Sequence, residues 1–213
     1  MKTIASVAIR KSGRPLSFDR NAALHKAMLV FWQHGYEATS LSELTGAMGV
    51  TPPSIYAAFG DKKKLFLEAV GLYLSGPITS DTIINNAATA RDAALGLLNA
   101  AARGFTGSDT PRGCLLASST QSCSAAAADV QNELSAIRRR IEARLKGKIA
   151  GAIKAHEMPA DTDADALAGH IMAVIQGMSS LARDGASLKK LRRIADAAMR
   201  SWPDDGSQRA AKK

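Results

Sequence analysis

The chain has 213 residues, which is enough to bury one large hydrophobic core or two smaller ones. Its 46% hydrophobic and 22% charged residues are ordinary for a soluble globular protein, and no apolar run approaches the length of a membrane span. Aromatic residues are scarce and alanine is abundant, which favours helices over strands. The net charge of +9 indicates either a polyanionic partner, nucleic acid or an anionic membrane surface, or a solubilising surface alone.

Residues 1–16 are expected to form a basic, mobile arm. They carry four basic residues, among them Arg14, and no acidic residue. The first helix is predicted to begin near Ser17 or Asp19, because either residue suits an N-cap, and to end at Gly35. Its apolar residues follow the spacing of one buried stripe: Leu24, Ala27, Met28 and Phe31.

Two short helices are predicted next. Ser40-Leu41-Ser42-Glu43 has the capping-box pattern, in which the serine hydroxyl and the glutamate carboxylate each accept a hydrogen bond from a backbone N–H. This helix is expected to stop at Gly49. Thr51 then suits an N-cap, with Pro52 and Pro53 in a first turn where their missing N–H groups do no harm.

Three lysines begin the following helix, for which Asp61 is the predicted cap. The helix dipole disfavours cations at this end, so Lys62, Lys63 and Lys64 are out of place for stability alone. A bound phosphate would offset that cost, and a solvated run of charge is the alternative. The helix is expected to be buried through Leu65, Phe66, Ala69, Val70 and Tyr73.

The two short helices and the longer helix before them match a helix-turn-helix, with Gly49-Val50 as the turn. In that motif the second helix presents its N-terminal residues to the major groove of DNA. Packing in a small bundle without DNA is the alternative. The residues expected to face DNA are Arg14, Ser40, Ser42, Thr51, Pro52, Pro53, Ser54, Tyr56, Ala57 and Lys62.

The stretch from Gly13 to Val70 resembles the N-terminal domain of TetR-type transcriptional repressors. The likeness rests on Gly13-Arg14-Pro15, His34-Gly35-Tyr36, Thr39-Ser40-Leu41, Met48-Gly49-Val50, the run from Ser54 to Phe59, and Leu65-Phe66-Leu67. The segment from Pro111 to Leu116 matches one branch of the family. The resemblance implies that Tyr56 and Lys62 hold phosphates, that Ser42 and Ser54 sit at the groove, and that Arg14 reaches from the arm. Pro52 and Ala57-Ala58 depart from the family, in which a basic or amide residue and a Tyr-His pair often stand there.

The sequence predicts an all-α protein of about nine helices in two folded parts. The helix-turn-helix domain is expected over residues 17–75, and a larger helical bundle for ligand sensing and dimerisation over residues 76–203, with the boundary at Gly76-Pro77. Residues 204–213 are expected to be a disordered tail. The predicted helices of the bundle span residues 89–105, 112–124, 126–156, 163–184 and 187–202.

A ligand pocket is predicted among the helices between residues 89 and 156. Hydroxyl side chains at Ser118 to Ser122 lie beside apolar residues, and close packing of small residues is the alternative. Because few aromatics follow Tyr73, a small and partly polar ligand is favoured over a flat cationic one. The expected lining is Tyr73, Phe105, Cys114, Leu115, Ser118, Ser119, Gln121 and Ser122.

The last two long helices carry apolar stripes at spacings of three and four residues. We expect these stripes to form the interface of a two-fold homodimer, since paired recognition helices require one. Burial within one subunit is the alternative. The expected interface is Leu167, Ile171, Val174, Met178, Leu181, Leu191, Ala195, Ala198 and Trp202.

Other chemistry finds little support in the sequence. The four histidines show no metal-ligand spacing, and no cofactor-binding motif or nucleophile elbow is present, so neither a metal nor a cofactor is expected. Cys114 and Cys123 are expected on opposite faces of a helix, and a redox role for either is the alternative to a structural one. The basic residues from Arg138 to Lys148 are expected to form a solvated face, with a second DNA-facing surface as the alternative.

The sequence therefore predicts a cytoplasmic, dimeric DNA-binding regulator. Its expected partners are a palindromic double-stranded operator and a small-molecule ligand that releases a repressor from that DNA. A helical enzyme or a basic protein of the membrane surface is the alternative, but no convergent set of acid, base and nucleophile is visible. The N-terminus also lacks the apolar core of a signal peptide.

Overall fold

The computed structural model describes residues 18–76, 78–119 and 127–203. Within these ranges all regular secondary structure is helical, in ten helices, which confirms the all-α fold. The predicted arm with Arg14, the predicted tail, and Gln121, Ser122 and Cys123 lie outside the described residues.

The first four helices are α1 (Arg20–His34), α2 (Leu41–Met48), α3 (Pro52–Phe59) and α4 (Lys62–Leu74). Each predicted start is confirmed. The carboxylate of Asp19 accepts hydrogen bonds from two N–H groups of α1, and Asp61 accepts from the N–H of Lys64 at 2.7 Å. The predicted capping box is also present, since the Ser40 hydroxyl accepts from the Glu43 N–H and the Glu43 carboxylate accepts from the Ser40 N–H.

The remaining helices are α5 (Ser80–Asn86), α6 (Ala90–Gly104), α7 (Leu115–Ser118), α8 (Ala128–Lys154), α9 (Ala164–Arg183) and α10 (Leu188–Met199). Helix α5 was not predicted. Its start carries a reciprocal cap in which Thr79 and Thr82 each use a side-chain oxygen to accept from the other's N–H. Threonine at the second position replaces the usual glutamate or glutamine, so this cap is easily missed in a sequence.

The predicted helix over residues 112–124 is wrong at its start. Gly113 has φ +84°, a conformation that L side chains rarely adopt, and a Cβ there would lie 3.0 Å from the carbonyl oxygen of Ser179. The N–H of Gly113 donates to the Phe105 carbonyl, and the N–H of Cys114 donates to the Ser179 hydroxyl. These bonds fix a tight turn against α6 and α9, so α7 begins only at Leu115.

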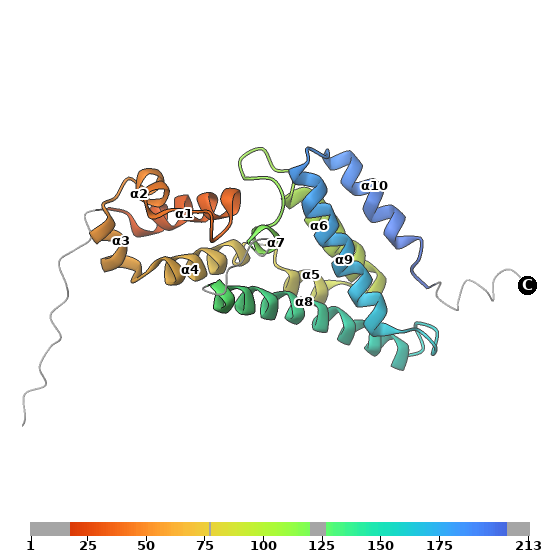
Figure 1. Ribbon diagram of the computed structural model, residues 1–213. Helices are drawn as coiled ribbons and strands as arrows, with labels where there is room; N and C mark the ends of the chain where they lie inside the picture. Colours follow the sequence, from red (N-terminus) through yellow and green to blue (C-terminus); the bar gives the residue numbers. More distant parts are fainter. Residues whose placement is uncertain (1–17, 77, 120–126, 204–213) are drawn as a thin grey trace, which may run out of the picture.

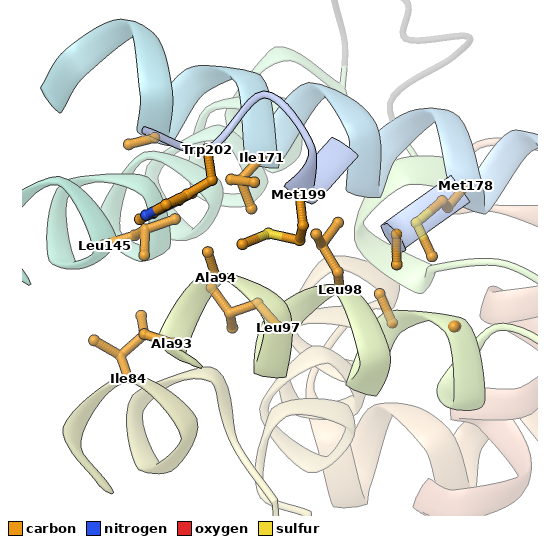
Figure 2. Packing of buried hydrophobic residues seen from close by; sticks show 14 of the residues in the cluster. Ile84, Ala93, Ala94, Leu97, Leu98, Leu145, Ile171, Met178, Met199 and Trp202 are labelled. Atoms are coloured by element: carbon orange, nitrogen blue, oxygen red, sulfur yellow. The ribbon is translucent and has the colours of Figure 1, made fainter. Parts of the chain in front are cut away.

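Two hydrophobic cores form. The N-terminal core packs α1 to α4 around buried aromatic side chains, with Phe66 edge-to-face on Phe31 at 5.0 Å between ring centroids. The C-terminal core packs α5, α6, α9, α10 and the second half of α8. Figure 2 shows Leu98, Ile171 and Trp202 pointing into this core from different segments.

Helix α8 belongs to both cores. Its first turns place Val130 and Leu134 in the N-terminal core, and later turns place Leu145 and Ile149 in the C-terminal core. In Figure 1 it runs from below α4, beneath α5, to the lower end of α9. Leu115 and Leu116 of α7 also complete the N-terminal core, so this core extends beyond the predicted boundary at Gly76-Pro77.

Candidate nucleic-acid interface and internal cavity

Helices α2 and α3 lie at one end of the molecule, away from the C-terminal helices (Figure 1). Each buries one face: Leu44 and Met48 of α2, and Ile55 and Phe59 of α3, belong to the N-terminal core. The opposite faces are open to solvent, and Tyr56 is 50% exposed although it is a large aromatic side chain. The predicted DNA-facing residues that are exposed are Ser40, Ser42, Thr51, Pro52, Pro53, Tyr56 and Ala57.

The start of α3 offers hydroxyls rather than backbone donors. Pro52 and Pro53 have no N–H, and the N–H of Ser54 already donates to the Thr51 carbonyl at 3.0 Å. Thr51 occupies the N-cap position as predicted, but its side chain makes no cap bond, and its hydroxyl lies 2.9 Å from that of half-buried Ser54. An anion here would therefore be met by side-chain hydroxyls.

The three lysines at the start of α4 have three different surroundings. Lys62 is half-buried: its Nζ lies 4.7 Å from the centre of the Tyr36 ring and donates to the Glu37 carbonyl at 3.3 Å. Burial lowers the pKa of Lys62, while Glu37 and Glu43 act in the opposite direction. Lys63 pairs with Asp129 of α8 at 2.7 Å, and Lys64 is exposed beside Asp61.

The side chain of Arg20 packs against α3 and α4 and is not directed to the DNA-facing surface. Its guanidinium donates to the Ala58 carbonyl, pairs with Glu68 of α4 at 2.7 Å, and lies 4.4 Å from the centre of the Phe59 ring. Arg20 therefore ties α1 to the end of α3 and to α4. Sequence reasoning missed this role, because nothing near Arg20 in the chain identifies partners 38 and 48 residues away.

A cavity of about 270 Å³ lies between helices α1 and α4 of the N-terminal region and the C-terminal helices. Trp32 of α1 and Tyr73 of α4 form part of its wall on one side, and α6, α8 and α9 contribute the other. Of the predicted pocket residues, Tyr73, Phe105 and Cys114 line it. Burial raises the pKa of Tyr73 well above its usual value, and the Tyr73 hydroxyl lies 3.5 Å from the Cys114 sulfur.

The predicted hydroxyl lining needs correction. Leu115 is fully buried in the N-terminal core, and the Ser118 hydroxyl bonds to carbonyl groups of Leu115 and Trp32. Ser119 is buried but does not line the cavity. The short α7 packs against α1 and α4, and Leu115, Ser118 and Ser119 are not among the residues that line the cavity. The polar side chains in its wall, besides Tyr73, are Thr79, Ser80, Arg138 and Gln176, none of which was predicted.

The apolar stripes of α9 and α10 are largely used within one chain. Ile171, Met178, Leu191, Ala195 and Trp202 are buried in the C-terminal core. Leu167, Val174, Leu181 and Ala198 are partly buried against the same core. Packing within one chain thus explains the spacing of these apolar residues. The same spacing was the basis for predicting a dimer interface, and it does not show where that interface lies.

The basic residues of α8 mostly hold other helices. Arg144 pairs with Asp81 of α5, Lys148 donates to the Ala87 carbonyl, and Lys146 pairs with Asp165 of α9 at 2.6 Å. Arg138 donates to the Leu116 carbonyl and the Ser135 hydroxyl. Of the basic residues expected on a solvated face, Arg139, Arg140 and Lys146 are exposed, and Arg138, Arg144 and Lys148 are half-buried.

Two short helices that pack on a longer helix and leave one face exposed are the arrangement of a helix-turn-helix protein. Within the described residues no helix is long and apolar enough to cross a membrane. No group of three or more potential metal ligands gathers in the same ranges.

Comparison with known proteins places the chain within that class. Residues 23–69 match the family described as "Bacterial regulatory proteins, tetR family", and residues 94–200 match "Tetracyclin repressor-like, C-terminal domain". The chain is 37% identical over 207 residues to the HTH-type transcriptional repressor ComR of Escherichia coli (strain K12), covering 96% of this chain and 99% of the relative. It is 29% identical over 191 residues to the repressor BdcR of the same strain, covering 89% and 91%.

Solved structures agree. A cysteine mutant of the TetR family transcriptional regulator CifR, complexed with 26bp double-strand operator DNA, superimposes with a TM-score of 0.84 at 36% identity. The match covers 90% of this chain and 100% of that one. The chain belongs to the TetR family of bacterial transcriptional regulators.

Proposed function

We propose that the protein is a homodimeric repressor that binds a palindromic operator through α2 and α3 and leaves it when a small molecule fills the cavity. The observation that carries the proposal is the exposed face of α3, where Tyr56 is 50% exposed near the hydroxyls of Thr51 and Ser54, on a helix whose other face is in the core. The proposed role is regulatory rather than enzymatic, and it is carried out in the cytoplasm, where the DNA lies.

The chemistry of that face suits a duplex. The hydroxyls of Thr51, Ser54 and Tyr56 can bond phosphates or base edges, and proline and alanine side chains can touch thymine methyl groups. Strong hydrogen-bond readers such as arginine or asparagine do not occur in α3. We therefore expect DNA shape and phosphate contacts to contribute much of the affinity. A dimer would place two such helices about 34–36 Å apart, one turn of DNA.

The cavity lies where a ligand can change the distance between the two α3 helices of a dimer. Trp32 and Tyr73 belong to helices of the DNA-binding part, and Arg138 and Gln176 belong to helices of the C-terminal part. A ligand that contacts both sides can favour one arrangement of α1 and α4 relative to α8 and α9. Differential affinity for two arrangements is what such regulation requires physically.

A matched pair of lysine variants tests the DNA-binding surface. Operators selected from a random DNA pool would be titrated by gel shift at several salt concentrations. Lys62→Ala should weaken binding to every sequence and reduce the salt slope by about one ion per subunit. Lys189→Ala, at an exposed position of α10, makes the same charge change and should have no effect on operator binding. Tyr56→Ala should weaken binding while leaving the melting temperature unchanged, because the side chain is outside the core.

Equal loss of affinity from Lys62→Ala and Lys189→Ala would place the DNA on another face. Unchanged binding by Tyr56→Ala would remove α3 from the interface. Melting temperatures of all three variants would separate a lost contact from a damaged fold.

A further inference from the structure

Among its described residues, the cavity wall holds one positive charge and no negative one. Arg138 is the charged residue among the described lining residues, and no aspartate or glutamate accompanies it. The rest of the wall is mostly apolar and includes the rings of Trp32, Tyr73 and Phe105. An arginine stays charged even in such surroundings, although burial lowers the pKa of Arg138.

Neutral groups hold this guanidinium in place. One terminal nitrogen donates to the Leu116 carbonyl at 2.9 Å and the other to the Ser135 hydroxyl at 2.9 Å. Neither acceptor carries a charge, and no described carboxylate forms an ion pair with Arg138. A guanidinium has five N–H donors, so donors remain for a planar two-oxygen acceptor such as a carboxylate.

The size and walls of the cavity restrict the rest of the ligand. The cavity volume of about 270 Å³ lies just below the roughly 300–1,000 Å³ typical of small-molecule sites, which favours a small ligand. Aromatic and aliphatic side chains favour an apolar body, because burial of that body away from water is favourable. Such a ligand has an apolar part and one anionic end.

We propose that the cavity binds a small monocarboxylate with an apolar or aromatic body, whose carboxylate pairs with Arg138. The proposal rests on the cavity being the ligand site of the proposed repressor. It also supplies a route to the DNA-binding part, because the guanidinium that would hold the carboxylate already donates to the Leu116 carbonyl. Leu116 belongs to α7, which packs against α1 and α4.

A panel of matched compounds tests the charge preference on the full-length dimer. Benzoate, 3-phenylpropanoate, hexanoate and octanoate would each be compared by calorimetry with the corresponding alcohol. At least one acid should bind about tenfold or more tightly than its alcohol, since charge-assisted bidentate bonds are roughly twice as strong as neutral ones. Arg138→Gln should abolish that preference, Arg138→Lys should retain part of it, and Arg140→Gln on the exposed side of α8 should leave it unchanged.

Binding of the alcohol serves as the control for an intact cavity in each variant. Equal affinity of every acid and its alcohol, or a preference that survives Arg138→Gln, would overturn the proposal. A gel shift run in parallel keeps the two proposals apart. An acid that binds through Arg138 without changing operator affinity would contradict ligand-controlled repression and leave the carboxylate site standing. Operator binding by a protein that shows no preference for any acid would contradict the carboxylate site and leave the proposed repressor standing.

Discussion

The two hydrophobic cores are built from different side chains. Among their described buried residues, the N-terminal core contains Phe31, Trp32, Phe59 and Phe66, with only three alanines. The C-terminal core contains ten alanines and two aromatic residues, Phe105 and Trp202. One core is therefore filled by interlocking rings, and the other by close approach of long helices.

The difference follows from the length of the helices. Helices α2 and α3 have eight residues each, too few to be stable alone in water, so their positions depend on tertiary packing. Rings that meet edge-to-face, as Phe66 and Phe31 do, fix such short elements in one orientation. Of the ten alanines in the C-terminal core, five lie in α6, which has 15 residues, and these small side chains let α9 and α10 approach it closely over several turns. The cavity lies between these two regions.

The largest expected loss of stability comes from removing one ring from the N-terminal core. Phe66 is fully buried, and Phe66→Ala should lower the free energy of unfolding by about 3–5 kcal/mol through lost burial and the cavity left behind. Because α7 and α8 join the two cores, thermal unfolding should remain a single transition at a lower temperature. Calorimetry would check this. A second transition at the wild-type temperature would show that the cores unfold independently.

Helix α8 allows the two cores to be compared within one element. Leu134 and Leu145 are both fully buried on α8, the first in the N-terminal core and the second in the C-terminal core. Either leucine-to-alanine change should cost about 2–5 kcal/mol in denaturant unfolding. Leu134→Ala should in addition weaken operator binding, because Leu134 supports the helices that carry α3. Equal operator affinity of the two variants would contradict the role of α8 as a support for the DNA-binding part.

Local signals predicted the N-terminal region well. Caps at Asp19, Ser40 and Asp61 act within three residues, and stripes such as Leu24 and Phe31 follow one helical period, so both are visible in a single sequence. The exposed face of α3 follows from the same pattern. Trp32 was missed as a cavity residue because its partners lie far along the chain: its indole N–H donates to the Gly113 carbonyl, 81 residues away.

The C-terminal region was predicted less completely for the same physical reason. A stripe such as Ile171 and Met178 shows that one face of α9 is buried, but not whether the same chain or a second subunit covers it. The turn at Gly113 and the placement of Arg138 in the cavity depend on contacts between α6, α8 and α9. Those contacts join different helices, at separations as large as the 65 residues between Cys114 and Ser179, and helical periodicity carries no information about them.

The smallest expected effect tests a surface contact between the two regions. Lys63 of α4 pairs with Asp129 of α8 at 2.7 Å, and the hydrogen bond from Lys63 lowers the pKa of Asp129. A carboxyl whose pKa is lower in the folded state stabilises the fold above its unfolded pKa of about 3.9, and this contribution is lost as pH falls through the folded value.

Asp129→Asn should therefore melt slightly below the wild type at pH 7, and the difference should shrink as the pH falls below the unfolded value of about 3.9 and the Asp129 carboxylate gains its proton. The effect is small because both side chains are open to solvent. Asp165→Asn removes a similar pair, with Lys146, between two helices of the C-terminal region and serves as the matched control. If Lys63 and Asp129 help to hold α4 on α8, only Asp129→Asn should also change operator affinity in a gel shift. A melting difference that does not shrink as the pH falls would mean that the lost charge is not its cause, and equal operator affinity of the two variants would reduce the contact to one ordinary surface pair.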